Sequence, residues 1–172
     1  MIITRSTSIG ETLALGKECS KCGNCCSYSS GALLDSDIPK IAEYLKITEK
    51  VLKEEYLEEV EKFNTTRLRP KLIRQKGRPH GRCIFLEDKN NCRIHEVKPT
   101  ECRIGNCSPD GEKLSIWFRL NYFVDPYDPE SIRQWAMYLE THPTISGGNL
   151  TDLVPDKERL SKMLNYSELR KK

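Results

Sequence analysis

The sequence has no long apolar run. Hydrophobic residues make up 37% of its 172 residues and charged residues 31%. No stretch approaches the roughly 18 consecutive apolar residues of a membrane-spanning helix, so no membrane association is expected. The N-terminal segment MIITRSTSIGETLALGKEC has one arginine, no apolar run of signal-peptide length and no small-residue cleavage pattern. It predicts a cytoplasmic protein, and thiols are usually kept reduced in that compartment.

The sequence also lacks the motifs of common catalytic sites. It contains no pattern of a catalytic dyad or triad, no phosphate-binding loop and no Rossmann glycine motif, so it assigns no catalytic residue and leaves enzymatic activity open. Without internal repeats or low-complexity linkers, a chain of this length is most simply a single domain over residues 1–172. Its low apolar content indicates that a metal ion or a covalent cross-link supports the fold.

Cysteine, in contrast, is abundant. Four of the eight cysteines fall in CSKCGNCC, residues 19–26. The spacing of Cys19, Cys22 and Cys25 is C-x2-C-x2-C, which lets the backbone loop around a metal with the thiolates on one side. This spacing supplies three corners of a ferredoxin cubane, and a single C-x2-C forms half of a zinc knuckle. The pattern therefore predicts a metal and leaves zinc and iron open.

Cys26 follows Cys25 directly. Neighbouring side chains in an extended segment diverge, so we expect Cys25 and Cys26 not to chelate one mononuclear ion together, but to face different centres or to include one bridging thiolate. Two tetrahedral ions that share one thiolate use seven of the eight cysteines, and two separate four-cysteine sites use all eight.

A second group of cysteines lies about 60 residues downstream and comprises Cys83, Cys92, Cys102 and Cys107. Cys83 and Cys92 flank a predicted hairpin with strands at 83–86 and 92–94, so its strands could present both sulfurs at one end. Cys102 falls in a short predicted helix. Local cysteine pairs from distant parts of a chain, closed over a metal, tie small metallo-domains together. All eight cysteines are therefore candidate ligands.

The combined pattern resembles the YkgJ-type cysteine-cluster family, also described as the zinc- or iron-chelating CxxCxxCC domain. The motifs that carry the resemblance are C-x2-C-x2-C-C from Cys19, then CIFL from Cys83, CRIH from Cys92 and KPTECR ending at Arg103. The resemblance implies a bacterial or archaeal cytoplasmic protein that binds zinc or iron, including iron as a 4Fe–4S cluster, with an undefined biochemical role. The family is distantly related to flagellin lysine N-methylases, yet no methyl-transfer cofactor pocket is evident.

The roles of His95 and Cys107 at the metal are open. His95 could ligate the metal through an imidazole nitrogen or donate a hydrogen bond to a thiolate, and we favour the hydrogen bond. Cys107 lies outside the seven cysteines of the family pattern, but a free thiol beside a metal centre would be exposed to oxidation. We therefore expect Cys107 to take part as a ligand. Arg103, next to Cys102, is expected to neutralise thiolate charge.

Other uses of the cysteines fit less well. A disulfide framework lacks the secretory segment that would accompany it. A dithiol redox site needs C-x2-C at the strand-to-helix junction of a βαβ unit, which is absent. A radical-methionine site needs C-x3-C-x2-C, but Glu18 stands where its first cysteine would fall.

The apolar patterns predict an α+β fold in which helices and short strands surround a cysteine-ligated metal centre. We expect a metal-binding core over residues 19–107 and a strand plus C-terminal helices over 112–172. The predicted elements are helices at 33–47, 48–63, from Asp128–Pro129 and at 160–164, a basic strand within 67–82, a turn at 108–111 and a strand at 116–124.

The charge pattern does not favour nucleic acid as a partner. The formal net charge of +3 counts every thiol as neutral, and metal-bound thiolates would make it slightly negative. Residues 67–82 are strongly basic but lack interleaved aromatic side chains, so we expect them to lie near the thiolates and the acidic helix. Two classes of function remain: a metal-organised module that binds a protein or nucleic-acid partner, and an iron–sulfur protein in electron transfer or catalysis. We favour a metal-binding protein with no assigned activity. A protein partner is left open, and the sequence identifies none.

Overall fold

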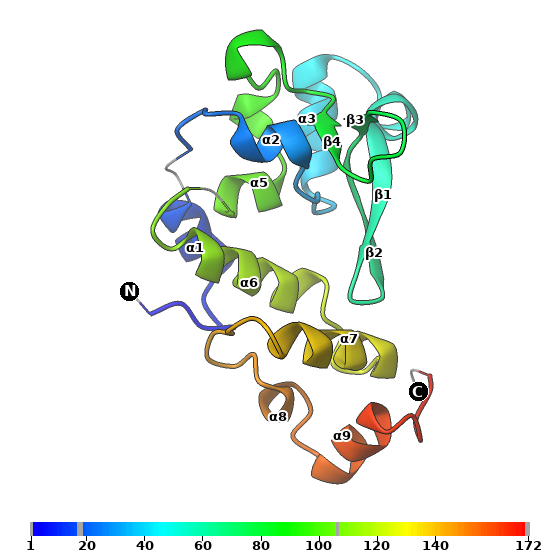
Figure 1. Ribbon diagram of the computed structural model, residues 1–172. Coiled ribbons are helices and arrows are strands. Elements are labelled where there is room, and N and C mark those ends of the chain that lie inside the picture. The colour runs from blue at the N-terminus through cyan, green and yellow to red at the C-terminus, as the bar shows by residue number, and fades with distance from the viewer. Residues whose placement is uncertain (1, 17–18, 106, 171–172) are drawn as a thin grey trace. The chain divides into compact units, whose positions relative to one another are not determined.

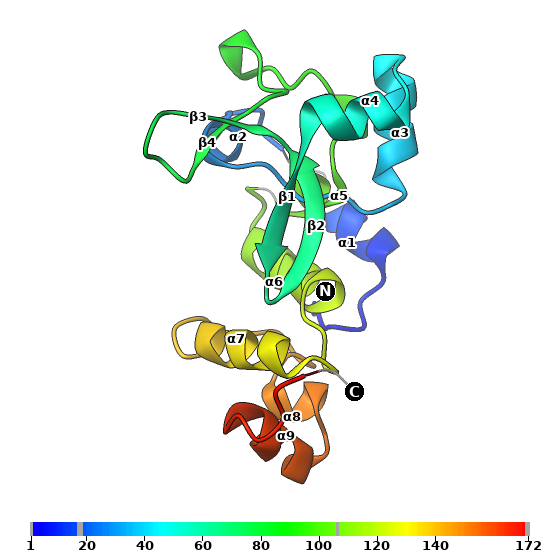
Figure 2. The same cartoon turned by 90° about the vertical axis from the view of Figure 1, so that its right-hand side faces the viewer.

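The computed structural model describes residues 2–16, 19–105 and 107–170. The chain divides into two compact units, and Figures 1 and 2 label their helices and strands. The helical unit comprises Met1–Leu15, Glu61–Thr66 and Pro109–Lys172, and the cysteine unit comprises Gly16–Val60 and Arg67–Ser108. All eight cysteines fall in the cysteine unit. The single domain over residues 1–172 stays a prediction. Within the described ranges, no helix has the length and apolar character to cross a membrane.

Short helices and two small sheets build the cysteine unit, which confirms the α+β class. Its helices are α2 (Asn24–Tyr28), α3 (Asp37–Leu45), α4 (Glu49–Val51), the π-helix η1 (Leu52–Tyr56), the 3-10 turns η2 (Asp88–Asn90) and η3 (His95–Val97), and α5 (Thr100–Ile104). Its strands are β1 (Leu57–Lys62), β2 (Thr65–Pro70), β3 (Leu72–Arg74) and β4 (Gly81–Cys83). β1 pairs with β2, and β3 pairs antiparallel with β4 with Leu72 opposite Cys83. The tip of the β1–β2 hairpin is assigned to the helical unit.

The predicted helix over residues 48–63 is wrong beyond its first two turns. Thr48 caps α4 by accepting a hydrogen bond from the amide of Val51, but the helix widens into η1 and ends at Tyr56. From Leu57 the chain is a strand with alternating burial. The strand is favoured because Glu58 on β1 forms ion pairs with Arg69 on the partner strand β2 and with Arg74 on β3 of the second sheet.

The basic segment 67–82 was predicted to contain a strand. It contains β3 and parts of β2 and β4. Arg69 lies 3.0 Å from Oε1 of Glu58, and Arg74 donates to both carboxylate oxygens of Glu58 at 2.6 and 2.8 Å. Its acidic partner was expected on a helix and lies instead on β1. These arginines have a structural role within the cysteine unit.

The hairpin predicted between Cys83 and Ile94 is confirmed only as a turn. Leu86 and Cys92 form an isolated antiparallel bridge around η2, supported by a hydrogen bond of 2.9 Å from the amide of Arg93 to the carbonyl of Phe85. Cys83 pairs with β3 rather than with the returning strand. Cys83 therefore pairs with β3, whereas Cys92 pairs with Leu86, and the two cysteines do not face each other in one hairpin.

The core of the cysteine unit brings together α3, η1, β4 and the turn after it. Its buried members include Leu33, Ile38, Ile41, Ala42, Leu52, Leu57, Cys83, Phe85, Leu86 and Ile94. The rings of Tyr56 and Phe85 stack with centroids 5.5 Å apart. Cys26 and Cys92 pack against the same cluster, so the thiols lie at the edge of this core.

The helical unit contains α1 (Ile9–Leu15), α6 (Gly111–Tyr122), α7 (Pro129–Leu139), α8 (Leu150–Leu153) and α9 (Lys157–Leu164). The predicted start of α7 is confirmed, because Asp128 accepts a hydrogen bond of 3.2 Å from the amide of Glu130 and Pro129 occupies the first turn. The helix predicted near the C-terminus is α9, and the predicted turn at 108–111 leads into α6.

The strand predicted over residues 116–124 is wrong, because this segment belongs to the helix α6. Ile116, Trp117, Phe118 and Leu120 are all buried. Alternation over a short window cannot distinguish a strand from a helix that is covered on several faces. The burial of adjacent Trp117 and Phe118 together with Leu114 is the helical i, i+3, i+4 pattern.

Candidate metal centre

The first cysteine segment turns sharply before it becomes helical. Lys21 and Gly23 have positive φ angles of 54° and 75°, and α2 begins at Asn24. Only glycine adopts the second conformation freely, and a Cβ at Gly23 would also overlap the side chain of Asn90. The two positive φ angles reverse the direction of the chain in this loop, as is needed for several of its cysteines to reach one metal ion.

The two adjacent cysteines lie close together. Cys25 and Cys26 are in the first turn of α2, and their Sγ atoms are 3.7 Å apart. The expectation that these side chains diverge is therefore wrong, because the segment is helical rather than extended. Ligands at about 2.3 Å from a tetrahedral zinc ion are separated by about 3.8 Å. The spacing of these two sulfurs thus matches one edge of a four-thiolate site.

Helix α5 carries Cys102 and is fixed by the first residue of α3 and by the loop before that helix. The buried carboxylate of Asp37 accepts hydrogen bonds from the amide and hydroxyl of Thr100 at 2.9 and 2.8 Å. The amide of Ala32 donates a bond of 2.6 Å to Oε2 of Glu101, and the amide of Gly31 donates one of 3.2 Å to Sγ of Cys102. This loop therefore places the Cys102 thiol beside the first cysteine segment.

Four thiols form one electrostatic cluster, which we call the inner quartet: Cys25, Cys26, Cys83 and Cys102. Every pair within the inner quartet interacts strongly enough to perturb a thiol pKa. The hydrogen bond between Cys25 and Cys26 lowers the pKa of Cys25 and raises that of Cys26. Burial raises the pKa of Cys83 to about 11 and also raises that of Cys102. Three segments that are separate in the sequence, α2, β4 and α5, thus contribute to this group of interacting thiols.

The other four cysteines, which we call the outer quartet, are Cys19, Cys22, Cys92 and Cys107. The backbone amide of Asn24 and the hydroxyl of Ser20 lower the pKa of Cys22. The neighbouring Cys22 raises the pKa of Cys107, with smaller effects from Cys25 and Cys19. Burial raises the pKa of Cys92, which also feels the charge of Cys19. Cys25 influences members of both quartets.

His95 has an unsatisfied polar atom. Its Nε2 is buried and has no hydrogen-bond partner in the described part of the chain. Burial lowers the pKa of its imidazole, and the charges of Lys98 and Lys21 lower it further. A metal or a thiolate would satisfy a buried nitrogen of this kind, and an ordered water would do so too. His95 therefore fits either of its two predicted roles.

Lys98 supplies positive charge at the thiols. Its ammonium lowers the pKa of Cys25 as a minor contribution, after the effect of Cys26 and backbone amides, and it opposes the effect of burial on Cys92. The sequence pointed to Arg103 for this role, which stays a prediction.

The thiols interact with one another, but their positions are not those of ligands around one ion. All eight cysteines are free. In residues 2–16, 19–105 and 107–170, no three Cys, His, Asp or Glu side chains lie close enough together to hold an ion as they stand. The donor chemistry nevertheless fits zinc or iron, because soft thiolates select these metals.

Three residues that position the cysteines were not identified from the sequence: Gly31, Asp37 and Glu101. Asp37 fell inside the helix predicted at 33–47 without being singled out, and its bonds to Thr100 span 63 positions. Gly31 and Glu101 carried no local signal. Their roles depend on partners about 70 positions away in the chain.

Comparison with protein families identifies the family of the chain. The model of the CxxCxxCC family, described as "Putative zinc- or iron-chelating domain", matches residues 18–121, more than half of the chain. No curated protein and no solved structure matches. The chain therefore belongs to the CxxCxxCC family of zinc- or iron-chelating domains.

Proposed function

We propose that this protein binds zinc or iron through cysteine thiolates, and that the inner quartet holds one ion. The supporting observation is the separation of 3.7 Å between the sulfurs of Cys25 and Cys26 on α2, with which the effects of Cys83 on β4 and Cys102 on α5 on the pKa of Cys26 agree. Burial and mutual repulsion raise the pKa of Cys26, Cys83 and Cys102, so these thiols stay protonated without a cation. A bound cation would stabilise their thiolate forms. Metal binding is then coupled to folding of the cysteine unit.

The proposed ion is mononuclear. In a cubane each cysteine binds a different iron atom, whereas Cys25 and Cys26 lie at the separation of two ligands of one tetrahedral ion, 3.7 Å. A single zinc or iron ion with four thiolates therefore accounts for the adjacent cysteines better than a 4Fe–4S cluster does.

We assign a second ion to the outer quartet. Cys22 and Cys107 interact directly, and Cys19 influences both Cys92 and Cys107. This division uses all eight thiols and includes Cys107, which the family pattern leaves out. It also favours a reducing compartment such as the cytoplasm, because eight thiolates need protection from oxidation.

Anaerobic purification, metal analysis and a visible spectrum test the proposal. We expect about two zinc or iron ions per chain, no cluster absorption and recovery of all thiols after denaturation in a chelator. A brown protein with bound sulfide would show that iron–sulfur chemistry replaces the mononuclear centre. A metal-free protein with native disulfides would contradict metal binding altogether.

A further inference from the structure

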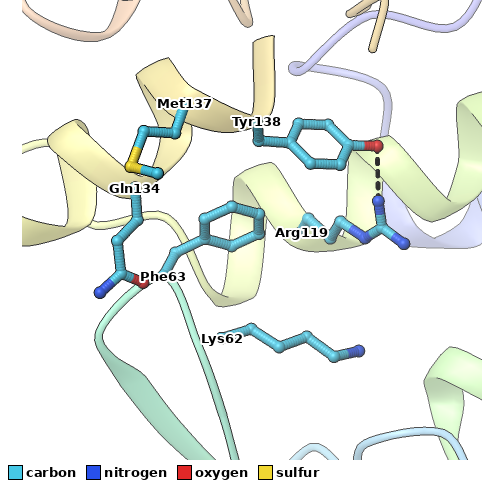
Figure 3. Close-up of a pocket in the computed structure, with 6 residues that line it drawn as sticks. All are labelled: Lys62, Phe63, Arg119, Gln134, Met137 and Tyr138. Atoms are coloured by element: carbon cyan, nitrogen blue, oxygen red, sulfur yellow. Dashed lines mark hydrogen bonds between the residues drawn. The ribbon is translucent and has the colours of Figure 1, made fainter. Parts of the chain in front are cut away.

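The helical unit contains a cavity that includes none of the cysteines. Its volume is about 500 Å³, it is open to solvent, and it is lined by Lys62, Phe63, Arg119, Gln134, Met137 and Tyr138 (Figure 3). The first two residues belong to the tip of the β1–β2 hairpin, and the others belong to α6 and α7. The lining combines two cationic side chains with two aromatic rings and a thioether, and it contains no acidic residue.

Phe63 reaches the cavity through an unfavourable backbone conformation. Phe63 and Asn64 have φ angles of 51° and 56°, as in a two-residue hairpin turn. Asparagine tolerates this region, but a bulky aromatic residue rarely adopts it. Strain of this kind persists where the surrounding contacts enforce it and is concentrated at functional positions. Here the turn is fixed by the amide of Asn64, which donates to Oε1 of Gln134 at 3.0 Å.

The aromatic wall of the cavity is rigid. The Phe63 ring meets Trp135 and Tyr138 edge-on, with centroids 5.2 and 5.7 Å away. Tyr138 in turn stacks on Trp135 at 5.0 Å and on His142 at 4.1 Å. A wall held from several sides loses little freedom when a ligand binds, which favours affinity.

Arg119 presents an unused hydrogen-bonding edge. Its Nη1 donates to the hydroxyl of Tyr138 at 2.6 Å, which orients the guanidinium. In the part of the chain that the structure describes, Nε and Nη2 donate to no acceptor and no carboxylate pairs with Arg119. In Figure 3 this edge and the ammonium of Lys62 lie on the same side of the cavity. The Nε–Nη2 edge of a guanidinium matches the two oxygens of a planar carboxylate.

We propose that this cavity binds a small organic acid that carries a carboxylate and, on a short linker, an aromatic ring. Arg119 takes the carboxylate through Nε and Nη2, while Phe63 and Met137 contact the ring. The cavity volume is in the range of small-molecule sites. This binding site goes beyond the proposed metal function and involves none of the cysteines.

Nuclear magnetic resonance of the full-length, metal-loaded protein tests the proposal, with 3-phenylpropionate as the probe and its neutral amide as the matched control compound. We expect saturable shifts of the Trp135 indole and Gln134 side-chain amide signals with the acid. The neutral amide should bind at least ~10-fold more weakly, because it lacks the charge-assisted pair. Equal binding of acid and amide would overturn the proposal.

Two variants locate the site. Arg119→Gln should weaken binding of the acid by at least ~10-fold, whereas Lys113→Gln, which removes the same charge from an exposed position of α6, should leave it within ~2-fold. Met137→Glu places a negative charge at a position that is 67% exposed, so it should abolish binding without affecting folding. If Met137→Glu binds the acid like the unmodified protein, the proposal is wrong even where Arg119→Gln fails to fold.

Discussion

The backbone amide of Gly31 donates a hydrogen bond of 3.2 Å to Sγ of Cys102, across 71 positions of the chain. This bond joins the loop after the first cysteine segment to α5, the helix that carries Cys102. It partly offsets the effect of burial on the pKa of Cys102. Hydrogen bonds from amides to thiolate sulfur stabilise the charged, metal-binding form.

Replacement of Gly31 by alanine tests whether this contact shapes the centre. A Cβ there would lie 2.6 Å from Sγ of Cys102 and 2.7 Å from its backbone nitrogen. We expect Gly31→Ala to lower the free energy of unfolding by about 2 kcal/mol and to weaken metal binding in a competition titration with a chelator. Gly10→Ala is the control, since its nearest contact would be 4.0 Å away. Metal affinity equal in the two variants would argue against the role of Gly31.

Asp37 should be the strongest single stabilising carboxylate of the cysteine unit. It is 2% exposed and accepts bonds from the amides of Leu34 and Thr100 and from the Thr100 hydroxyl. Asp37→Ala leaves these buried donors without an acceptor, so urea denaturation should show a loss of about 3 kcal/mol. The exposed Asp35→Ala should change stability by less than about 0.5 kcal/mol. Similar losses in both would contradict this assignment.

Glu58 should make stability depend on pH below neutrality. The hydrogen bonds from Arg74 lower its pKa to about 2 in the folded protein, with further contributions from Leu72 and Arg69. Because the folded pKa is depressed, the stabilisation is complete above the unfolded value of about 4.3 and is lost as the pH falls towards 2.

The comparison of Glu58→Gln with the unmodified protein isolates this effect. We expect the variant to be less stable by up to about 3 kcal/mol at pH 7 and the difference to shrink between about pH 5 and pH 2. Glu59→Gln, an exposed neighbour on β1, should show no such trend. A difference that stays constant down to pH 2 would refute the ion-pair account.

Cysteine variants should separate the two proposed ions. Cys102→Ser should lose the ion of the inner quartet, and Cys107→Ser should lose only the ion of the outer quartet. Native mass spectrometry of the anaerobic proteins would then give about one ion per chain for each variant. A full metal complement in Cys107→Ser, with Cys102→Ser depleted in parallel, would show that the eighth thiol is not a ligand.

The sequence was sufficient to identify what depends on local spacing. The C-x2-C-x2-C-C run, the cap of α7 at Asp128 and the short helix around Cys102 all follow from residues within a few positions of one another. The family assignment rests on the same local motifs.

The errors arose where long-range partners decide the structure. Glu58 lies on a strand because arginines on β2 and β3 face it, and α6 is covered on several faces, which resembles strand alternation in a short window. Cys25 and Cys26 lie close together because α2 is helical. A five-residue helix that contains two cysteines has no sequence pattern that would predict it. None of these determinants is visible in a local window of sequence.

X-ray absorption spectroscopy of the metal-loaded protein tests the central claim most directly, because it reports the atoms bound to each ion. The account predicts about four sulfur neighbours per ion at about 2.3 Å for zinc, with no metal–metal vector of a cluster. A first shell of nitrogen and oxygen, or a short iron–iron vector, would contradict mononuclear thiolate sites built from the inner and outer quartets.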